Sequence, residues 1–340
     1  MENYRMKITV LGAGTWGVAL ASLLFKNGHE VTLWSAIPDE LEELRLTGRH
    51  KNLPDAVIPE GVAYDGNIES AIEGSEMLLF VVASAYIRKT AALVSPFLRD
   101  GVMLVNASKG IEPSTNLTMT EVISEEVEKA QPTLVYEVAA LSGPTHAEEV
   151  VKGLPTSIVS ACKSEETSRR IAKVFFNSCM RVYVNTDVLG VEIAGALKNI
   201  IALAAGANRG MGFGDNAAAM LITRGIAEIT RMGVAMGANP KTFSGLAGIG
   251  DLIVTATSRH SRNNRCGELI GMGKSYEEAK EEIGMVVEGY YALEAAMELS
   301  KKYGVEMPIT EAVNSVIKHG VSVKDAMLSL MNRDMKNEIT

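Results

Sequence analysis

The sequence predicts an α/β protein in which an N-terminal Rossmann-type doubly wound sheet is followed by an all-helical C-terminal domain. Short apolar runs alternate with helical patterns through the first half of the chain, which is typical of βαβ units and a parallel sheet. A glycine-rich turn follows the first apolar run directly. No convincing strand pattern remains after Thr186, so we expect one domain over residues 1–186 and a second over residues 187–340.

The expected strands are short, apolar and bounded by turn residues. They cover residues 7–11, 30–34, 76–82, 102–107, 134–141, 156–161 and 181–185. A helical pattern from Thr15 to Asn27 joins the first two, and Gly28 is placed to end that helix. The run EMLLFVV at 76–82 is almost entirely apolar, as expected for a strand covered on both faces. Residues 187–235 and 286–340 show helical patterns, with glycine-rich loops between them.

The composition is that of a globular protein with a large core. The chain has 340 residues, of which 47% are apolar, so two domains are expected. The net charge is −8 and the basic residues are scattered, so we expect neither a nucleic-acid partner nor a membrane surface partner. The N-terminus runs directly into the first strand. This arrangement predicts no signal peptide and a cytoplasmic protein.

The cysteines and the longest apolar window exclude other classes. Cys162, Cys179 and Cys266 lie far apart and are odd in number, so neither a disulfide framework nor a metal site is expected. The apolar window 189–207 is interrupted by Glu192, Lys198 and glycines. We interpret it as a core helix and expect no membrane insertion.

The turn KITVLGAGTWG at residues 7–17 predicts a dinucleotide site. It carries Gly12, Gly14 and Gly17 in the G-x-G-x-x-G spacing between a strand and a helix. The first glycine allows the tight turn, the second a close approach of the pyrophosphate, and the third close packing of helix on strand. The N–H groups at the start of the helix then face the anion. The strand before the turn and the helix after it favour this interpretation over a plain β-turn-α joint.

The sequence leaves the choice between NAD and NADP open. An acidic residue about twenty positions after the glycines would bind the ribose 2′-hydroxyl of NAD. Ser35 and Ala36 occupy that place, Asp39 lies further on, and no arginine stands there for a 2′-phosphate. The hydroxyl of Ser35 could bind either group.

Lys198 stands out because it lies in a stretch that is otherwise suited to a buried helix. Between Val188 and Asn208 the only charged residues are Glu192 and Lys198. An ammonium group is almost never fully buried without a partner, so Lys198 either reaches water along its stem or serves a site. Six residues separate the two charges, about 120° around an α-helix. We therefore expect Glu192 to be satisfied by another segment.

Other candidate site residues lie in polar loops. Lys109, in NASKGI after a strand, would lie at the carboxyl end of the sheet, where ligands bind in such folds. Thr145 and Glu148 have capping-box spacing, which predicts a helix start there and either a second anion site or a simple cap. His146 beside them is more typical of a structural histidine.

The segment GLAGIGDLIVTATSRHSRNNRCG at 245–267 is the densest of these loops. Asp251 opens an apolar run and could be a helix N-cap. Residues 261–265, Ser-Arg-Asn-Asn-Arg, form a donor cluster suited to a phosphate, since arginine presents a planar fork to its oxygens. The alternative is an exposed polar loop, and for Arg265 we favour that alternative.

Seven motifs in order give the chain a family resemblance. They are GAGTWG (12–17), NASKGI (106–111), SGPTHAEEVVKGLPT (142–156), VEIAGALKNIIALAAG (191–206), GDNAAAMLITRG (214–225), GLAGIGDLIVTATSRHSRNNRCG (245–267) and VVEGYYA (286–292). With these motifs the chain resembles the bacterial NAD(P)-dependent glycerol-3-phosphate dehydrogenases over essentially its whole length. The resemblance implies an enzyme that interconverts dihydroxyacetone phosphate and sn-glycerol 3-phosphate with NAD(P)H. It also implies a homodimer whose product supplies phospholipid synthesis.

The resemblance also implies roles for individual residues. Lys198 is the implied catalytic residue. The implied substrate contacts are Lys109, Gly143, Thr145, Lys198, Asn199, Asp251, Ser261, Arg262 and Asn263. The implied cofactor contacts are Thr15, Trp16, Lys109, Ala147, Arg262, Val286 and Glu288, which join the glycines Gly12, Gly14 and Gly17 and the candidate Ser35. Relatives often carry arginine or histidine where this chain has Ala36.

Two rival functions remain at this point. A related β-hydroxyacid-type dehydrogenase would share the architecture and the lysine after the Rossmann domain, but would act on a sugar acid or a small hydroxyacid. A cofactor-binding sensor would bind NAD(P)H without turnover. The donor cluster at residues 261–265 favours a phosphorylated substrate over the first rival. Two lysines in apolar or glycine-rich surroundings, Lys109 and Lys198, speak against the second.

Overall fold

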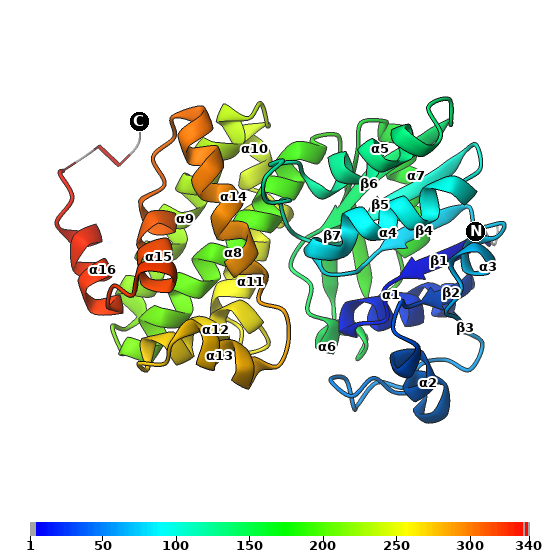
Figure 1. The fold of residues 1–340 in the computed structure, drawn as a ribbon, viewed down its shortest axis with the longest axis horizontal. Helices are drawn as coiled ribbons and strands as arrows, with labels where there is room; N and C mark the ends of the chain where they lie inside the picture. The colour runs from blue at the N-terminus through cyan, green and yellow to red at the C-terminus, as the bar shows by residue number, and fades with distance from the viewer. Residues whose placement is uncertain (1–4, 336, 339–340) are drawn as a thin grey trace.

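The computed structural model describes residues 5–335, 337 and 338, which form two lobes side by side (Figure 1). The N-terminal lobe is built around one sheet, and the C-terminal lobe consists of helices (Figure 1). The last strand ends at Asn185 and the next helix begins at Val188, and the described part of the chain contains no further strand. The expected fold class, a Rossmann domain followed by an all-helical domain, is confirmed.

The sheet has eight strands in the order β3-β2-β1-β4-β5-β6-β7-β8. Their bounds are β1 Lys7–Leu11, β2 Glu30–Trp34, β3 Ala63–Asp65, β4 Met77–Phe80, β5 Val102–Asn106, β6 Tyr136–Ser142, β7 Thr156–Cys162 and β8 Met180–Asn185. Every strand expected from the sequence is present within a residue or two of its predicted ends. The strand β3 was not predicted, because three residues at the sheet edge are too few to show a pattern.

The expectation of a parallel sheet is wrong at one place. All neighbouring strands run parallel except β6 and β7, where Ala139 pairs with Cys162 and Ser142 with Val159 in antiparallel register. The connection between these two strands contains only the four-residue helix α6, Ala147–Val150. No long helix carries the chain back across the sheet, so β7 returns in the opposite direction.

Helices cover both faces of the sheet. Their bounds are α1 Thr15–Lys26, α2 Pro38–Thr47, α3 Ile68–Ile72, α4 Ile87–Val94, α5 Met119–Ala130 and α7 Glu165–Phe175, with short 3-10 turns η1 Ser84–Tyr86 and η2 Ser95–Phe97. Leu79 of β4 packs in the cluster that α1 and α7 share, whereas Leu78 and Phe80 pack in the cluster with α4 and α5. The apolar run at 76–82 is thus buried on both faces, as predicted.

The helical lobe is organised around one long helix. Its elements are α8 Val188–Met211, α9 Asp215–Ala235, α10 Pro240–Phe243, a π-turn η3 Leu246–Gly250, α11 Asp251–Thr257, α12 Arg262–Gly271, α13 Tyr276–Ile283, α14 Glu288–Tyr303, α15 Pro308–His319 and α16 Val323–Met331. In the described residues α8 is long and apolar enough to cross a membrane, but 83% of its most apolar window is buried inside the protein. It is the core helix that the sequence predicted.

Helices α8 and α12 cross with their backbones in close contact. A Cβ on Gly206 would lie 1.9 Å from the carbonyl oxygen of Asn264, and one on Gly267 would lie 2.0 Å from that of Leu203. Only glycine allows this approach. The crossing carries the start of α12 alongside the middle of α8.

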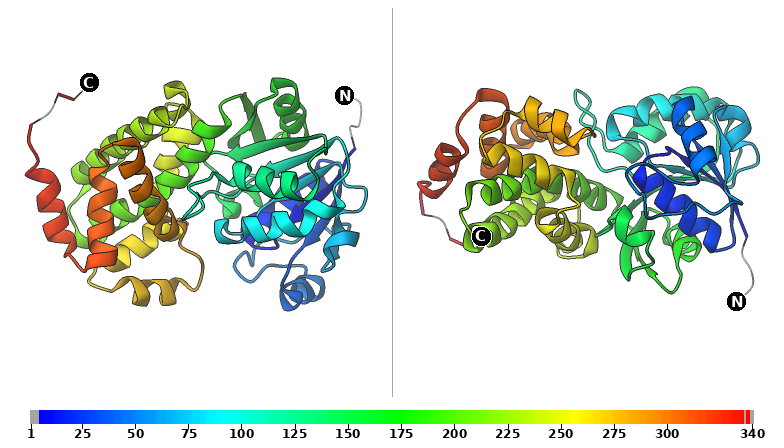
Figure 2. Two further views of the ribbon diagram at one scale, coloured as in Figure 1. Left: turned by 45° about the horizontal axis from the view of Figure 1, so that its top comes forward. Right: turned by 90° about the horizontal axis from the view of Figure 1, so that it is seen from below.

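The two lobes meet where β6 and β7 pack against the start of α8 (Figure 2). Ala140 and Val159 of the sheet share a small apolar cluster with Val191 and Ala247 of the helical lobe. Asp187 caps α8 by accepting a hydrogen bond from Gly190 N at 2.9 Å. The junction brings the loops that follow the strands beside α8.

Candidate active site

The glycine turn after β1 has the geometry of a dinucleotide cradle. Gly12 adopts φ +122°, and a Cβ there would lie 2.9 Å from Val82 N. A Cβ on Gly17 would lie 1.9 Å from the carbonyl oxygen of Gly12. Gly14 has open space around it, and no side chain caps the helix that follows. Free N–H groups beside open space fit the pyrophosphate of NAD(P)H.

Contacts in the structure bring only some of the expected cofactor residues close to this turn. Thr15 and Trp16 open α1, where its free N–H groups lie. Ser35 lies just after Trp34, whose carbonyl accepts from Gly12 N at 2.9 Å. The Ser35 hydroxyl is engaged, because it donates to Glu40 at 2.6 Å and accepts from Ile37 N at 3.2 Å. The sequence pointed to Asp39 and not to Glu40 here, because a contact across the first turn of α2 leaves no pattern in the sequence.

The second centre of the site joins two lysines through one carboxylate. Lys198 Nζ lies 2.7 Å from Asp251 Oδ1, and Lys109 Nζ lies 2.6 Å from Asp251 Oδ2. Lys198 is 5% exposed and Asp251 1% exposed. The lysine is therefore both buried and paired. Asp251 is also not the N-cap that its position allowed, because helical backbone at Gly250 precedes it and its carboxylate binds the two ammonium groups.

Burial changes the acidity of Lys198. It lowers the pKa of Lys198 to about 7, the Asp251 carboxylate opposes this shift, and the Lys109 ammonium adds to it. Desolvation disfavours a charged amine, as does a like charge nearby. A lysine with this pKa can both donate and accept a proton near neutral pH.

Thr255 belongs to the same centre and was missed by the sequence analysis. Its hydroxyl accepts from Lys198 Nζ at 2.5 Å and donates to the Asp251 carbonyl oxygen at 2.7 Å. Residues four apart on a helix share a face, so the spacing of Asp251 and Thr255 on α11 was the available signal.

The turn after β6 differs from its prediction. Lys109 Nζ donates to the Gly143 carbonyl oxygen at 3.0 Å, and the Thr145 hydroxyl donates to the same oxygen at 3.2 Å. The predicted capping box is therefore wrong: α6 begins at Ala147, its N-cap is His146, and no side chain caps it. Thr145 turns back toward Gly143 because the helix starts later than the pattern indicated.

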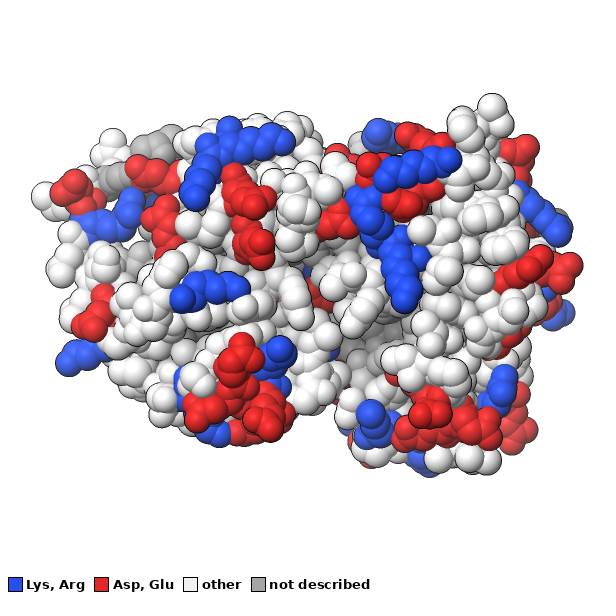
Figure 3. Space-filling model, viewed as in Figure 1, with Lys and Arg blue, Asp and Glu red and all other residues white. Residues whose placement is uncertain are grey.

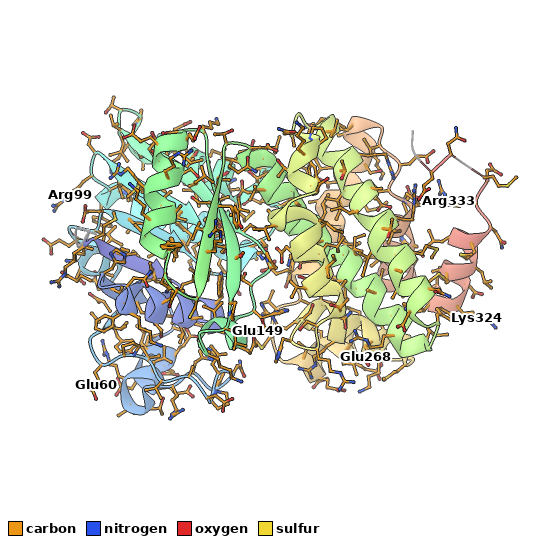
Figure 4. The ribbon with its side chains drawn as sticks, turned by 180° about the vertical axis from the view of Figure 1, so that it is seen from behind. Glu60, Arg99, Glu149, Glu268, Lys324 and Arg333 are labelled. Atoms are coloured by element: carbon orange, nitrogen blue, oxygen red, sulfur yellow. The ribbon has the colours of Figure 1, made fainter. Side chains whose placement is uncertain are left out.

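His146 contacts another histidine. Its ring lies 5.7 Å from that of His260, and its Nε2 is buried without a hydrogen-bond partner among the described residues. Burial lowers the pKa of His146, the Glu148 charge opposes this shift, and the charge of Lys198 adds to it. Glu149, on the same short helix, lies near the junction of the two lobes (Figure 4).

Arg262 opens α12 as an unpaired cation. Ser261 caps this helix by accepting from Asn264 N at 3.2 Å. Over the residues that the structure describes, the Arg262 guanidinium makes no hydrogen bond or ion pair. Burial lowers the pKa of Arg262, while the charges of Glu288 and Glu148 raise it. A free guanidinium at a helix N-terminus suits a phosphate. Arg265, by contrast, is exposed, as expected.

Asn199 and Asn263 bind each other. Asn263 Nδ2 donates to Asn199 Oδ1 at 3.0 Å, and Asn263 Oδ1 accepts from Gly289 N at 2.8 Å. Asn199 also donates to the Gly195 carbonyl oxygen at 3.4 Å. These bonds join α8, α12 and α14 around the start of α12. Substrate contact by either side chain stays a prediction.

Glu288 joins the two lobes. Its carboxylate accepts from Ser84 N at 3.1 Å and from the Ser84 hydroxyl. Burial raises the pKa of Glu288. Val286 lies in the turn before α14, and Ala147 is buried at the start of α6. Cofactor contact by these three residues stays a prediction.

The structure also bears on the expectations for Glu192, for the cysteines and for a metal site. Glu192 is satisfied by another segment, since it accepts from Asn106 Nδ2 at 2.9 Å and from Thr120 N at 3.0 Å. The three cysteines are free thiols. Within residues 5–335, 337 and 338 no group of three His, Cys, Asp or Glu side chains could hold a metal ion. Figure 3 shows acidic and basic side chains mixed over both lobes, with a hollow between the lobes on this face.

Comparison with known proteins identifies the family. Residues 7–168 match the family described as NAD-dependent glycerol-3-phosphate dehydrogenase N-terminus, and residues 187–328 match its C-terminus. A glycerol-3-phosphate dehydrogenase [NAD(P)+] of Lactobacillus delbrueckii subsp. bulgaricus is 53% identical, over 98% of this chain and 99% of that protein. One from Fusobacterium nucleatum is 47% identical over 98% and 99%.

A solved structure agrees with these sequence matches. The glycerol-3-phosphate dehydrogenase of Coxiella burnetii superposes with a TM-score of 0.92 at 33% identity, covering 97% of this chain and 99% of that one. The chain belongs to the NAD-dependent glycerol-3-phosphate dehydrogenase family.

Proposed function

We propose that Lys198 is the general acid and base of an NAD(P)-dependent glycerol-3-phosphate dehydrogenase. The chain interconverts dihydroxyacetone phosphate and sn-glycerol 3-phosphate by hydride transfer with NAD(P)H. The observation that carries the role of Lys198 is its burial between Asp251 and Thr255, with a pKa of about 7. An ordinary surface lysine would hold its proton too tightly to exchange it near neutral pH.

Each residue of this centre has a separate role in the reaction. When bound, NAD(P)H supplies the hydride that carbon 2 of the ketone accepts. Lys198 Nζ gives a proton to the ketone oxygen as negative charge develops there, and takes it back in the oxidation. Lys109 adds a second positive charge beside that oxygen, which stabilises the developing alkoxide. Asp251 holds both ammonium groups in place through its two carboxylate oxygens.

The start of α12 supports the binding of the substrate phosphate. Arg262 offers a guanidinium without an ionic partner in the described structure, beside the N–H groups of the first helical turn. We propose Ser261, Asn263, Asn199, Gly143 and Thr145 as the surrounding contacts. Alignment of a substrate held at both ends can be worth about 7–11 kcal/mol of the barrier.

The cofactor is proposed to bind across the glycine turn. Gly12, Gly14, Thr15, Trp16 and Gly17 would hold the pyrophosphate. Ser35, Lys109, Ala147, Arg262, Val286 and Glu288 are the further proposed contacts. Residues 1–186 would then form the dinucleotide-binding domain and residues 187–340 the substrate domain. We also propose that the enzyme is a cytoplasmic homodimer whose product feeds glycerophospholipid synthesis.

The deciding experiment is the oxidation of NADH and NADPH, followed by absorbance, with and without dihydroxyacetone phosphate. Oxidation that depends on this substrate is expected. No turnover despite cofactor binding would point to the sensor. Turnover only with a small hydroxyacid's keto form would point to the β-hydroxyacid-type dehydrogenase.

A further inference from the structure

The second charged residue of α8, Glu192, makes an unusual set of contacts. It is 6% exposed, and its carboxylate accepts from Asn106 Nδ2, from Thr120 N and from the Thr120 hydroxyl. None of these partners carries a charge. A buried carboxylate without a cation is expensive, and burial accordingly raises the pKa of Glu192. Charge balance therefore does not explain why Glu192 is buried among these partners.

Those partners lie at the two ends of the segment that carries Lys109. Asn106 ends β5 and Thr120 lies in the first turn of α5, so one carboxylate from α8 fixes both ends of residues 106–120. Asn106 also binds both backbone groups of Ser108, the residue before Lys109: it donates to the carbonyl oxygen and accepts from the N–H, each at 3.0 Å. A chain of hydrogen bonds thus runs from Glu192 to the backbone next to Lys109.

The same segment is attached to the helical lobe elsewhere. Ile111 is 2% exposed and packs in the core of that lobe. Asn116, with a left-handed φ of +60°, donates to Glu298 of α14 at 3.0 Å. The stem of Lys109 runs past Gly195, where a Cβ would lie 3.6 Å from Lys109 Cγ. The Lys109 segment therefore belongs to the nucleotide lobe by sequence but is fixed on the substrate lobe by contacts.

We propose that Glu192 is a positioning residue that keeps Lys109 beside Asp251 and Lys198. It touches neither reactant and acts through Asn106 and Ser108. This inference rests on the proposed reaction, because it makes the spacing of Lys109 and Lys198 in that site depend on Glu192.

The groups that act on Lys198 make the inference testable by pH. The pKa of Lys198 responds to its burial, to Asp251 on α11 and to Lys109 after β5. His146 after β6 faces the same group, and the Lys198 charge lowers the pKa of His146. Lys109 lowers the pKa of Lys198. If Lys109 moves away, the pKa of Lys198 must rise, because a repelling charge is lost.

The variant Glu192→Gln keeps the shape of the side chain but places an NH2 group opposite N–H and O–H donors. We expect kcat for ketone reduction to fall about 10–100-fold, the range for a misplaced catalytic group, and the midpoint of its pH profile to move up. Asn106→Ala, which breaks the relay to Ser108, should move the midpoint the same way. It provides a second test if the first variant folds poorly.

Glu228→Gln is the matched control. Glu228 is 1% exposed and accepts from Ile309 N at 2.9 Å, from Thr310 N at 3.0 Å and from the Thr310 hydroxyl at 2.6 Å. It should lose comparable stability while kcat and the pH midpoint stay unchanged. An unmoved midpoint in Glu192→Gln and Asn106→Ala would overturn the inference. A wild-type enzyme without turnover would overturn the proposed reaction instead.

A separate observation bears on the choice of cofactor. Ser35 follows the residue that binds the glycine turn, so it lies where an NAD enzyme places its acidic residue. The Glu40 carboxylate reaches this point from α2 and accepts from the Ser35 hydroxyl at 2.6 Å. In the described ranges Glu40 has no lysine or arginine at ion-pair distance. Arg45, the one lysine or arginine of α2, instead donates to the Tyr64 carbonyl oxygen and lies 3.9 Å from the Glu42 carboxylate.

We infer that Glu40 makes the enzyme prefer NADH. An uncompensated carboxylate beside the adenosine ribose accepts hydrogen bonds from its hydroxyls and repels a 2′-phosphate. The inference rests on the proposed cofactor site.

Dissociation constants for NADH and NADPH, measured by calorimetry on the intact enzyme, test this inference directly. NADH should bind at least about tenfold more tightly, and Glu40→Gln should reduce the difference by strengthening NADPH binding. Asp39→Asn, at the exposed neighbouring carboxylate, should leave the ratio unchanged. Equal or tighter NADPH binding by the wild type would overturn the inference. Binding of neither would overturn the cofactor site itself.

Discussion

Lys109 and Lys198 bind opposite oxygens of one carboxylate, Asp251 Oδ2 at 2.6 Å and Oδ1 at 2.7 Å. The two lysines come from different lobes, one from the loop after β5 and the other from α8. When both lysines are protonated, two positive charges and one negative charge leave this site net positive. Such a site favours an alkoxide over a neutral ketone, which is the charge change that the reaction produces.

The first prediction concerns pH. Reduction needs the protonated form of Lys198 and oxidation needs the neutral form. Because its pKa is lowered to about 7, kcat for reduction should fall as pH rises through about 7, and kcat for oxidation should rise over the same range. Steady-state pH profiles in both directions measure this. Profiles that move in the same direction would contradict the assignment.

The second prediction is that Lys198→Ala loses turnover and keeps its cofactor. The general acid contributes about 10²–10⁴-fold to the rate, so kcat should fall by that amount. NADH binding should survive, because Lys198 binds Asp251 and Thr255, which lie in the helical lobe and far from the glycine turn in the sequence. Asp251 would keep Lys109 as its partner, so the fold should hold. The exposed Lys324 on α16 (Figure 4) supplies the control. Lys324→Ala should leave both kcat and NADH binding unchanged.

The third prediction separates two neighbouring arginines. Arg262→Ala removes a charged hydrogen bond to the substrate phosphate, which should raise KM for dihydroxyacetone phosphate about 10–100-fold. Turnover of unphosphorylated dihydroxyacetone should change little. Arg265→Ala is the control, since that side chain is exposed three residues further on. Equal effects of the two substitutions would remove Arg262 from the phosphate site.

The sequence predicted what depends on local patterns. Apolar strands such as 102–107 and the turn of Gly12 and Gly14 follow from short-range sterics and burial, and they appear where expected. The direction of β7 depended on the path of a loop, which no local pattern encodes. The predicted cap at Thr145 is wrong for a related reason. The Thr145 hydroxyl donates to the Gly143 carbonyl oxygen, and the helix begins further along the chain.

The sequence identified most of these site residues, but it did not show which of them bind each other. Lys198 and Asp251 were both singled out, but 53 positions separate them and only the fold brings them together. Thr255 carried a usable signal in its spacing from Asp251. Glu40 carried none, because its role depends on how α2 turns back toward β2.

The close crossing of α8 and α12 has a consequence for substrate length. With Gly206 pressed against the carbonyl of Asn264 and Gly267 against that of Leu203, the two backbones form a single rigid body. In the proposed function, α8 carries the proton donor Lys198 and α12 carries the phosphate anchor Arg262. The separation of the two backbones that carry Lys198 and Arg262 is therefore set by main-chain contact. A phosphorylated ketone one carbon longer or shorter should therefore be turned over more slowly, because the two helices cannot shift apart or together to follow its length.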